Sequence, residues 1–169
     1  MLCLFVNNLL RNHMNRLDDR PYFFDQGVCF ECQRCGTCCT GDPGSICVEN
    51  NDISRIARYL DFPVSHLMEK YLRPHKNSYS ILEDSDGRCL FYEDAGCRIY
   101  PVRTNQCSTY PFWFENLRSL KEWRHVSREC PGIGSGSFYS KEQVLEMVRS
   151  NMDAILKSRI TSSKKYQSY

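Results

Sequence analysis

Apolar residues recur at the 3.6-residue spacing of an amphipathic helix in three stretches of the chain. Their positions are Ile53, Ile56, Ala57 and Leu60 in the first stretch, Leu67, Met68, Tyr71 and Leu72 in the second, and Val144, Met147, Val148, Met152 and Ile155 in the third. Asn51 or Asp52 is the expected N-cap of the first helix, and Ser65 that of the second. Ser140 is expected to cap the third, where Gln143 completes a capping box. The spacing therefore predicts three helices that each bury one face.

Short strands are predicted before and between these helices. The run PYFFDQGVCFE (residues 21–31) alternates enough to form a short strand. Residues 79–101, YSILEDSDGRCLFYEDAGCRIYP, contain three strand-like runs separated by acidic turns, and Asp86-Gly87 is a hairpin signal. Asp beside Gly is ordinary turn chemistry. We therefore interpret the carboxylates of this segment as turn residues rather than as a catalytic pair, namely Glu83, Asp84, Asp86, Glu93 and Asp94. The elements together predict a small α+β domain with short antiparallel strands and peripheral helices, organised around a cysteine site.

The length of 169 residues predicts one domain with a modest core. Residues 1–20 are expected to be a poorly ordered N-terminal extension, residues 21–158 the domain, and residues 159–169 a disordered tail. Hydrophobic residues make up 41% of the chain, but this includes 11 cysteines. Without them roughly a third of the chain remains, which is lean for a globular protein. Part of the stability is therefore expected to come from whatever the cysteines bind.

Charge and hydropathy exclude two classes of partner. The net charge of +2 comes from 22 basic and 20 acidic residues spread along the chain, so we expect no nucleic acid and no anionic membrane as partner. No apolar stretch is long enough to cross a bilayer, and the run from Leu2 to Val6 lacks the flanks of a signal peptide. Met14 is an alternative natural start. We expect a cytoplasmic protein, and in that reducing compartment cysteines are more often metal ligands or catalytic groups than disulfides.

The run CFECQRCGTCC, residues 29–39, places five cysteines in eleven positions. Cys32, Cys35 and Cys38 form a C-x2-C-x2-C triplet, which can bring three thiolates to one metal or cluster, and Gly36 allows the backbone to turn tightly. Ferredoxin-type clusters combine such a triplet with a remote cysteine that is often followed by proline, as Cys130 is here. The run therefore predicts metal ligation.

The identity of the metal is left open between iron–sulfur and zinc. Structural zinc usually takes two separated knuckles, whereas the later cysteines of this chain stand singly, at positions 89, 97, 107 and 130. This spacing favours an iron–sulfur cluster of the [4Fe–4S] type over zinc. A third hypothesis is a redox dithiol of Cys32 and Cys35, in which Arg34 would lower the pKa of a thiol. The neighbouring Cys38 and Cys39 argue against isolated dithiol chemistry.

Residues near these cysteines suggest how a charged site would be stabilised. The arginines within a few residues of a candidate ligand are Arg34, Arg88, Arg98 and Arg103. The glycine-rich CPGIGSG segment could donate backbone N–H groups to sulfur. TYPFWF (residues 109–114), with Trp123, is expected to form an apolar shell that excludes water. The histidines lack ligand spacing, and His125, the best candidate, is expected to be solvated.

The ordered motifs resemble those of a known family. Cys32-x2-Cys35-Gly-x-Cys38-Cys39 is followed by Gly87-x-Cys89-x-Phe91, GCRIYPVRTNQC and CPGIGSG, which is similar to the YkgJ-like CxxCxxCC cysteine-cluster family of zinc- or iron-chelating domains. The resemblance runs from about Phe30 to about Gly136. It implies that eight cysteines act together, namely Cys32, Cys35, Cys38, Cys39, Cys89, Cys97, Cys107 and Cys130.

The chain departs from the family pattern around its seventh cysteine. Thr104 stands where the family tends to have proline, and Ser108 where it tends to have arginine. Cys3, Cys29 and Cys47 lie outside the pattern, and we interpret Cys29 as a half-buried strand residue rather than a ligand.

The resemblance extends to the cluster region of flagellin lysine methylases, which are longer and are linked to an iron–sulfur cluster. It implies a cytoplasmic metal-binding protein with an unidentified protein partner, and it leaves open whether the protein is an enzyme. An enzyme would be an iron–sulfur-dependent oxidoreductase or a transferase that uses S-adenosylmethionine to methylate protein lysines. The alternative is a structural zinc module that binds a protein partner and has no catalysis of its own.

Overall fold

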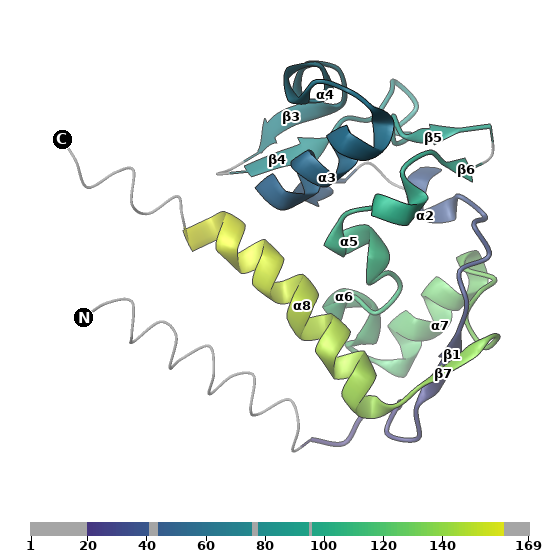
Figure 1. The fold of residues 1–169 in the computed structure, drawn as a ribbon. Coiled ribbons are helices and arrows are strands. Elements are labelled where there is room, and N and C mark those ends of the chain that lie inside the picture. The colour runs from purple at the N-terminus through teal and green to yellow at the C-terminus, as the bar shows by residue number, and fades with distance from the viewer. Residues whose placement is uncertain (1–19, 41–43, 76–77, 95, 161–169) are drawn as a thin grey trace, which may run out of the picture.

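The computed structural model describes residues 20–40, 44–75, 78–94 and 96–160, with side chains up to residue 152 (Figure 1). The predicted N-terminal extension and the predicted tail lie almost entirely outside these ranges. The described chain combines helices with short antiparallel strands, which confirms the predicted α+β class. Its buried side chains divide into two hydrophobic clusters, here called the first core and the second core.

The first core lies in the upper half of the molecule in Figure 1. A three-stranded antiparallel sheet is ordered β2 (Cys47–Val48), β4 (Ser78–Ile81) and β3 (Leu72–His75), and helices α3 (Asn50–Leu60) and α4 (Val64–Tyr71) pack beside it. Its buried members are Val48, Ile53, Ile56, Ala57, Leu67, Tyr71, Leu72, Ile81, Phe91 and Ile99.

The second core lies in the lower half, where β1 (Val28–Phe30) pairs with β7 (Ser137–Tyr139) although more than a hundred residues separate them. Three helices complete this half: α6 (Phe114–Leu117), α7 (Leu120–Glu129) and the long α8 (Lys141–Ile160). Its buried members are Phe24, Phe30, Phe112, Leu117, Trp123, Cys130, Val144, Leu145 and Val148.

Short elements connect the two halves. They are α2 (Thr37–Thr40), the hairpin of β5 (Tyr92–Glu93) and β6 (Gly96–Cys97), the 3-10 helix η1 (Tyr100–Val102) and α5 (Asn105–Ser108). Figure 1 shows α5 between α3 and α8. The Gln106 side chain bonds the backbone at Ser45 and Cys47, while Asn105 donates to the Ser150 carbonyl of α8 at 3.0 Å. The segment that carries Cys107 is therefore bonded to both halves.

The helix starts differ from the predictions in two of three cases. The N-cap of α3 is Glu49, not Asn51 or Asp52, because Glu49 and Asp52 form a reciprocal capping box with Asp52 in the third helical position. Pro63 precedes α4, so Ser65 lies inside its first turn rather than at the cap. At α8 the capping box is confirmed, since Ser140 N–H donates to the Gln143 side chain at 2.9 Å.

The strand predictions were partly wrong in extent. Of the run 21–31 only Val28–Phe30 lie in the strand β1, which starts directly after Gly27, a glycine with φ of 77°. The strand β3 was not predicted, because it contains Pro74; as an edge strand it tolerates the missing N–H donor. The predicted turn around Asp86-Gly87 is confirmed, since the Asp84 carboxylate accepts the N–H groups of Asp86 and Arg88, both at 2.9 Å.

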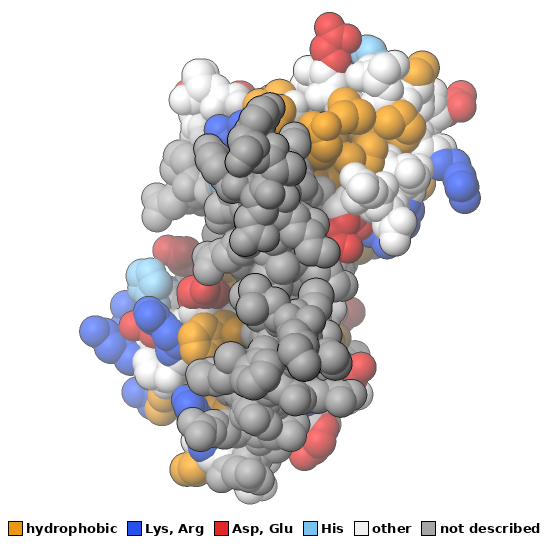
Figure 2. Space-filling view, turned by 90° about the vertical axis from the view of Figure 1, so that its left-hand side faces the viewer, with side chains coloured by type: hydrophobic (Ala, Val, Ile, Leu, Met, Phe, Trp, Pro, Cys, Tyr) orange, Lys and Arg blue, Asp and Glu red, His pale blue; other side chains and the backbone are white. Residues whose placement is uncertain are grey.

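The surface differs between the halves. In Figure 2 a hydrophobic patch faces the viewer on the upper half, and basic side chains gather on the lower half. Among the described residues no helix has both the length and the apolar character needed to span a bilayer.

Candidate metal centre

All eight cysteines of the predicted set line one cavity of about 70 Å³. They arrive from well-separated parts of the chain: the 32–39 run, the loop at Cys89, strand β6, helix α5 and the end of α7. A single buried water needs roughly 10–15 Å³ by the same measure, so the cavity has room for a polyatomic group. Cys35 and Cys38 are exposed, which places the open side of the cavity at the 32–39 run.

The turn at Gly36 allows the 32–39 run to fold back on itself. Gly36 is buried with φ of 79°, a region that favours glycine, and a Cβ there would overlap the Tyr92 ring. Its carbonyl accepts the N–H of Cys39 at 2.8 Å, which starts the short helix α2. Glycine at this position therefore permits Cys38 and Cys39 to stand beside the β5–β6 hairpin.

Backbone N–H groups point at three of the thiols in the same pattern. The amides of Phe91, Ile99 and Gly132 each donate to the sulfur of the cysteine two residues earlier. These cysteines are Cys89, Cys97 and Cys130. Such donors stabilise thiolates and tune bound metals. The expectation that CPGIGSG donates to a sulfur is thus confirmed for the Gly132 amide.

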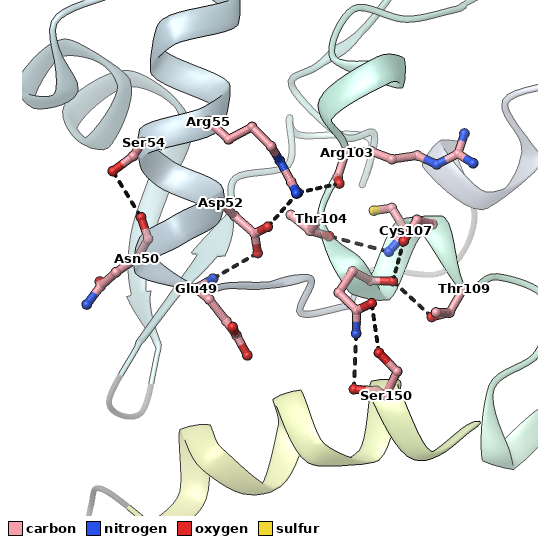
Figure 3. Close-up of polar contacts among 12 residues, drawn as sticks. Glu49, Asn50, Asp52, Ser54, Arg55, Arg103, Thr104, Cys107, Thr109 and Ser150 are labelled. Carbon is pink, nitrogen blue, oxygen red and sulfur yellow. Dashed lines mark hydrogen bonds and ion pairs between the residues drawn. The ribbon is translucent and has the colours of Figure 1, made fainter. Parts of the chain in front are cut away.

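Cys107 is positioned by the residue that replaces the proline of the family pattern. Thr104 is fully buried and caps α5, its hydroxyl accepting the Cys107 N–H at 3.3 Å (Figure 3). Arg55 of α3 holds the same segment from the other side, donating to the Arg103 carbonyl at 2.9 Å while it pairs with Asp52. The departure at position 104 therefore provides a helix cap for the segment of Cys107.

Replacing Thr104 with valine is expected to lower the free energy of unfolding by about 1 kcal/mol, the usual cost of a lost N-cap. The Cys107 N–H would also lose its partner, so metal should be lost to a competing chelator faster than from the unmodified protein. Ser119→Ala on α7 is the matched control, because it removes a cap that accepts from Glu122 at 3.2 Å away from the cavity. Urea titration and chelator competition measure the two effects. Equal metal loss in both variants would contradict the role assigned to Thr104.

Hydrogen bonds between three of the thiols lower the pKa of two of them and raise the pKa of the third. Cys38 and Cys39 sulfurs are 3.9 Å apart, and Cys39 also bonds Cys97. These bonds lower the pKa of Cys38 and of Cys97 to about 7 each, and they raise the pKa of Cys39 far above its ordinary value. Two thiols thus ionise readily near neutral pH, and the one between them holds its proton.

Burial, in contrast, raises the pKa of the thiols that lie deeper in the cavity. It raises the pKa of Cys89 to about 11 and that of Cys107 to about 12, and it raises the pKa of Cys130 as well. Thiols bind metals as thiolates, and a bound cation supplies the charge that favours their ionisation. The deep cysteines are therefore inert as nucleophiles but suited as metal ligands.

The four arginines near the cysteines fall into two groups. Arg34 and Arg103 line the cavity, and both guanidinium groups lie over the Tyr100 ring, at 4.3 and 3.9 Å from its centroid. The other two pair with carboxylates instead, Arg88 with Asp84 and Asp86, and Arg98 with Glu93. Arg34 and Arg103 can therefore balance thiolate charge, while Arg88 and Arg98 serve surface ion pairs.

The apolar wall of the cavity was only partly predicted. It consists of Phe30, Ile81, Phe91, Ile99 and Tyr110. Of the TYPFWF segment only Tyr110 reaches the cavity; Phe112 lies behind it, edge-on to Phe30 at 5.6 Å and stacked on Trp123 at 6.0 Å. Tyr100, which also lines the cavity, was missed. Sequence spacing carries no signal for it, because segments distant in sequence come together at the cavity.

Several cysteines and histidines lie outside the cavity. Cys29 stands opposite Phe138 in the β1–β7 pair and Cys47 opposite Ser80, so neither lines it. Cys3 and His13 lie outside the described residues, and no described histidine lines the cavity. Within the described ranges no three cysteine, histidine or carboxylate side chains stand close enough to hold one metal ion as placed. The sulfurs surround the cavity rather than meet at a point.

These features define a class of protein, a small α+β domain whose thiols converge on one apolar cavity. Residues 31–131 match the model of the CxxCxxCC family, whose description reads "Putative zinc- or iron-chelating domain". The chain belongs to this family. It is also similar to the uncharacterized protein MJ0661 of Methanocaldococcus jannaschii, with 30% identity over 88 residues, 51% of this chain and 46% of that protein. The match thus spans about half of each protein. No solved structure matches the chain.

The donor set agrees with the family's description. Thiolates suit zinc and iron–sulfur centres, and the cavity offers sulfur ligands without a carboxylate or histidine among its lining residues. The backbone donors and the two arginines complete the surroundings that such centres require. The thiols that line the cavity therefore suit a bound zinc or iron centre.

Proposed function

We propose that the protein is a metal-binding protein that holds iron–sulfur through its eight cavity cysteines and uses it in electron transfer. The observation that carries this proposal is that all eight thiols, from five separate segments, line a single cavity. A cavity that only filled space would not need eight thiols, because aliphatic side chains pack a core with no polar atoms.

The separation of the sulfurs supports iron–sulfur over zinc. A four-thiolate zinc site has Zn–S distances of about 2.3 Å, so its sulfurs lie roughly 3.8 Å apart. Among the described residues, no three cysteine, histidine or carboxylate side chains stand close enough as placed to share one ion in this way. In an iron–sulfur cluster the cysteines bind different iron atoms, so their sulfurs stand farther apart around a polyatomic core.

The surrounding residues support electron transfer rather than acid–base chemistry. When bound, the cluster would supply a one-electron redox couple. The aromatic and aliphatic wall excludes water, the amides of Phe91, Ile99 and Gly132 donate to sulfur, and Arg103 faces the thiolates with positive charge. The lining contains no carboxylate or histidine that could act as general base, so we favour electron transfer over lysine methylation with S-adenosylmethionine.

Location and partner follow from the same proposal. A cytoplasmic setting suits reduced thiols that must remain free to bind metal. Cys35 and Cys38 are exposed at the open side of the cavity, where a protein partner could approach for electron exchange. The alternative role, a structural zinc module, would leave this face without a redox function.

Protein purified without oxygen is expected to be brown, with iron and acid-labile sulfide in equal amounts and a visible absorbance that bleaches on reduction. Iron, sulfide and zinc analysis per chain measures this. Stoichiometric zinc in colourless protein would replace the electron-transfer proposal with the structural zinc role. Absence of both metals from protein prepared in this way would overturn metal binding itself.

A further inference from the structure

We propose that the eight cysteines form two four-cysteine metal centres, not one. The first centre consists of Cys39, Cys89, Cys97 and Cys107, and the second of Cys32, Cys35, Cys38 and Cys130. The inference rests on the proposed metal binding and adds the number of centres and the ligands of each.

The first set is joined by hydrogen bonds within the upper half. The Cys89 N–H donates to the Cys39 carbonyl at 2.9 Å, and the thiols of Cys39 and Cys97 are hydrogen-bonded. Cys89 and Cys97 both pack against the first core. Three sulfurs are thus tied to one half of the molecule.

The second set is joined by backbone pairing within the lower half. Glu31 N–H donates to the Gly132 carbonyl at 3.1 Å, and Phe30 forms a bridge with Ile133. These contacts fix the chain entering Cys32 beside the chain leaving Cys130, and both cysteines pack into the second core. Cys35 follows Cys32 in the same loop and stays on the open side.

Electrostatic interactions between thiols weaken with distance, and they divide in the same way. Cys107 interacts with Cys89, Cys38 and Cys97, whereas Cys130 interacts with Cys35, Cys38 and Cys32. Cys38 appears on both sides, and its sulfur lies 3.9 Å from that of Cys39 in the first set. Because Cys107 completes the first set of four, Cys38 is left as the fourth member of the second set and lies at the boundary between the centres. Four cysteines are the usual ligand number for zinc and for iron–sulfur clusters alike.

The arrangement gives each hydrophobic core its own centre. The first centre would anchor the β5–β6 hairpin and α5 to the first core, and the second would anchor the 32–38 loop to the end of α7. Cys38 and Cys39 are adjacent in sequence, so the two centres would be neighbours. Two neighbouring centres in one cavity would allow electrons to pass from the open side to the interior.

Metal analysis of three variants tests the partition. Cys89→Ala and Cys130→Ala are each expected to keep about half of the metal of the unmodified protein, and the double variant almost none. Cys47→Ala is the control, since Cys47 lies outside the cavity and should leave the metal content unchanged. Loss of all metal in either single variant would overturn the inference, because the ligands would then serve one centre.

Native mass spectrometry of the unmodified protein decides the question even if a variant fails to fold. Two centres per chain support the inference, and one centre per chain overturns it while leaving the proposed metal binding intact. A mass without any metal would instead overturn the proposed function.

Discussion

Removing the metal is expected to lower the melting temperature by about 8–16 °C and to separate the unfolding of the two halves. A ligand at about a thousand times its dissociation constant stabilises the folded state by about 4 kcal/mol. For a chain of this length each kcal/mol corresponds to about 2–4 °C. The shift follows because the ligands come from segments on both hydrophobic cores, so the metal-bound cavity holds the cores together.

The contacts that remain without metal explain why the halves should separate. The connecting segment is held largely by polar contacts, such as the bond from Arg55 to the Arg103 carbonyl and the bond from Asn151 to Thr109, at 3.1 Å. A net hydrogen bond contributes only about 1 kcal/mol, whereas each core buries its own set of apolar side chains. Each core can therefore persist without the other once the cavity loses its metal.

Two optical probes distinguish the halves. Both tryptophans, Trp113 and Trp123, belong to the lower half, where Trp123 is a member of the second core and Trp113 contacts Tyr110. Tryptophan fluorescence therefore reports the lower half, while far-ultraviolet circular dichroism reports both. The two melting curves should coincide with metal and diverge without it. Restoring the metal is the control and should bring the curves together again. Coincident curves at an unchanged temperature in metal-free protein would contradict the expectation.

That the eight cysteines lie around one cavity could be predicted from the sequence, because the spacing within the 32–39 run is local. C-x2-C steps bring thiols together whatever the rest of the chain does, and the family resemblance added the four single cysteines. The capping box at Ser140 was predictable for the same reason, since its two residues lie three positions apart. The cap of α3 was not, because Glu49 is an uncommon N-cap residue and the more favoured Asn and Asp follow it directly.

The surroundings of the site depend on contacts between distant segments, and these could not be predicted. Four arginines near cysteines looked equivalent in the sequence. Only the fold separates Arg34 and Arg103, which lie over Tyr100 at the cavity, from Arg88 and Arg98, which pair with nearby carboxylates. The same holds for the cavity wall, where Ile81 and Phe91 meet Phe30 from the other half.

Replacing Gly132 with alanine is expected to lower the free energy of unfolding by about 1–3 kcal/mol, the range for overpacking a buried site. Gly132 is buried, and a Cβ there would overlap the Glu31 carbonyl oxygen and come within 3.0 Å of the Phe30 ring. The overlapped atom belongs to the backbone, so the strand end and the Cys130 turn must move apart. That movement would displace Cys32 from Cys130 and break the Glu31–Gly132 hydrogen bond, 3.1 Å long.

The same variant should also lose the metal bound by the second set of cysteines, so about half of the total. Gly96→Ala is the matched control: Gly96 precedes Cys97 directly, and the nearest atom to an added Cβ is the Glu93 carbonyl oxygen at 3.9 Å. Denaturant titration and metal analysis of both variants measure the effects. Both glycines lie within two residues of a cavity cysteine. A loss of metal only in Gly132→Ala would therefore show that the metal depends on the close backbone contact between Glu31 and Gly132. Equal losses of metal in the two variants, or no loss in either, would show that metal binding does not depend on this backbone contact.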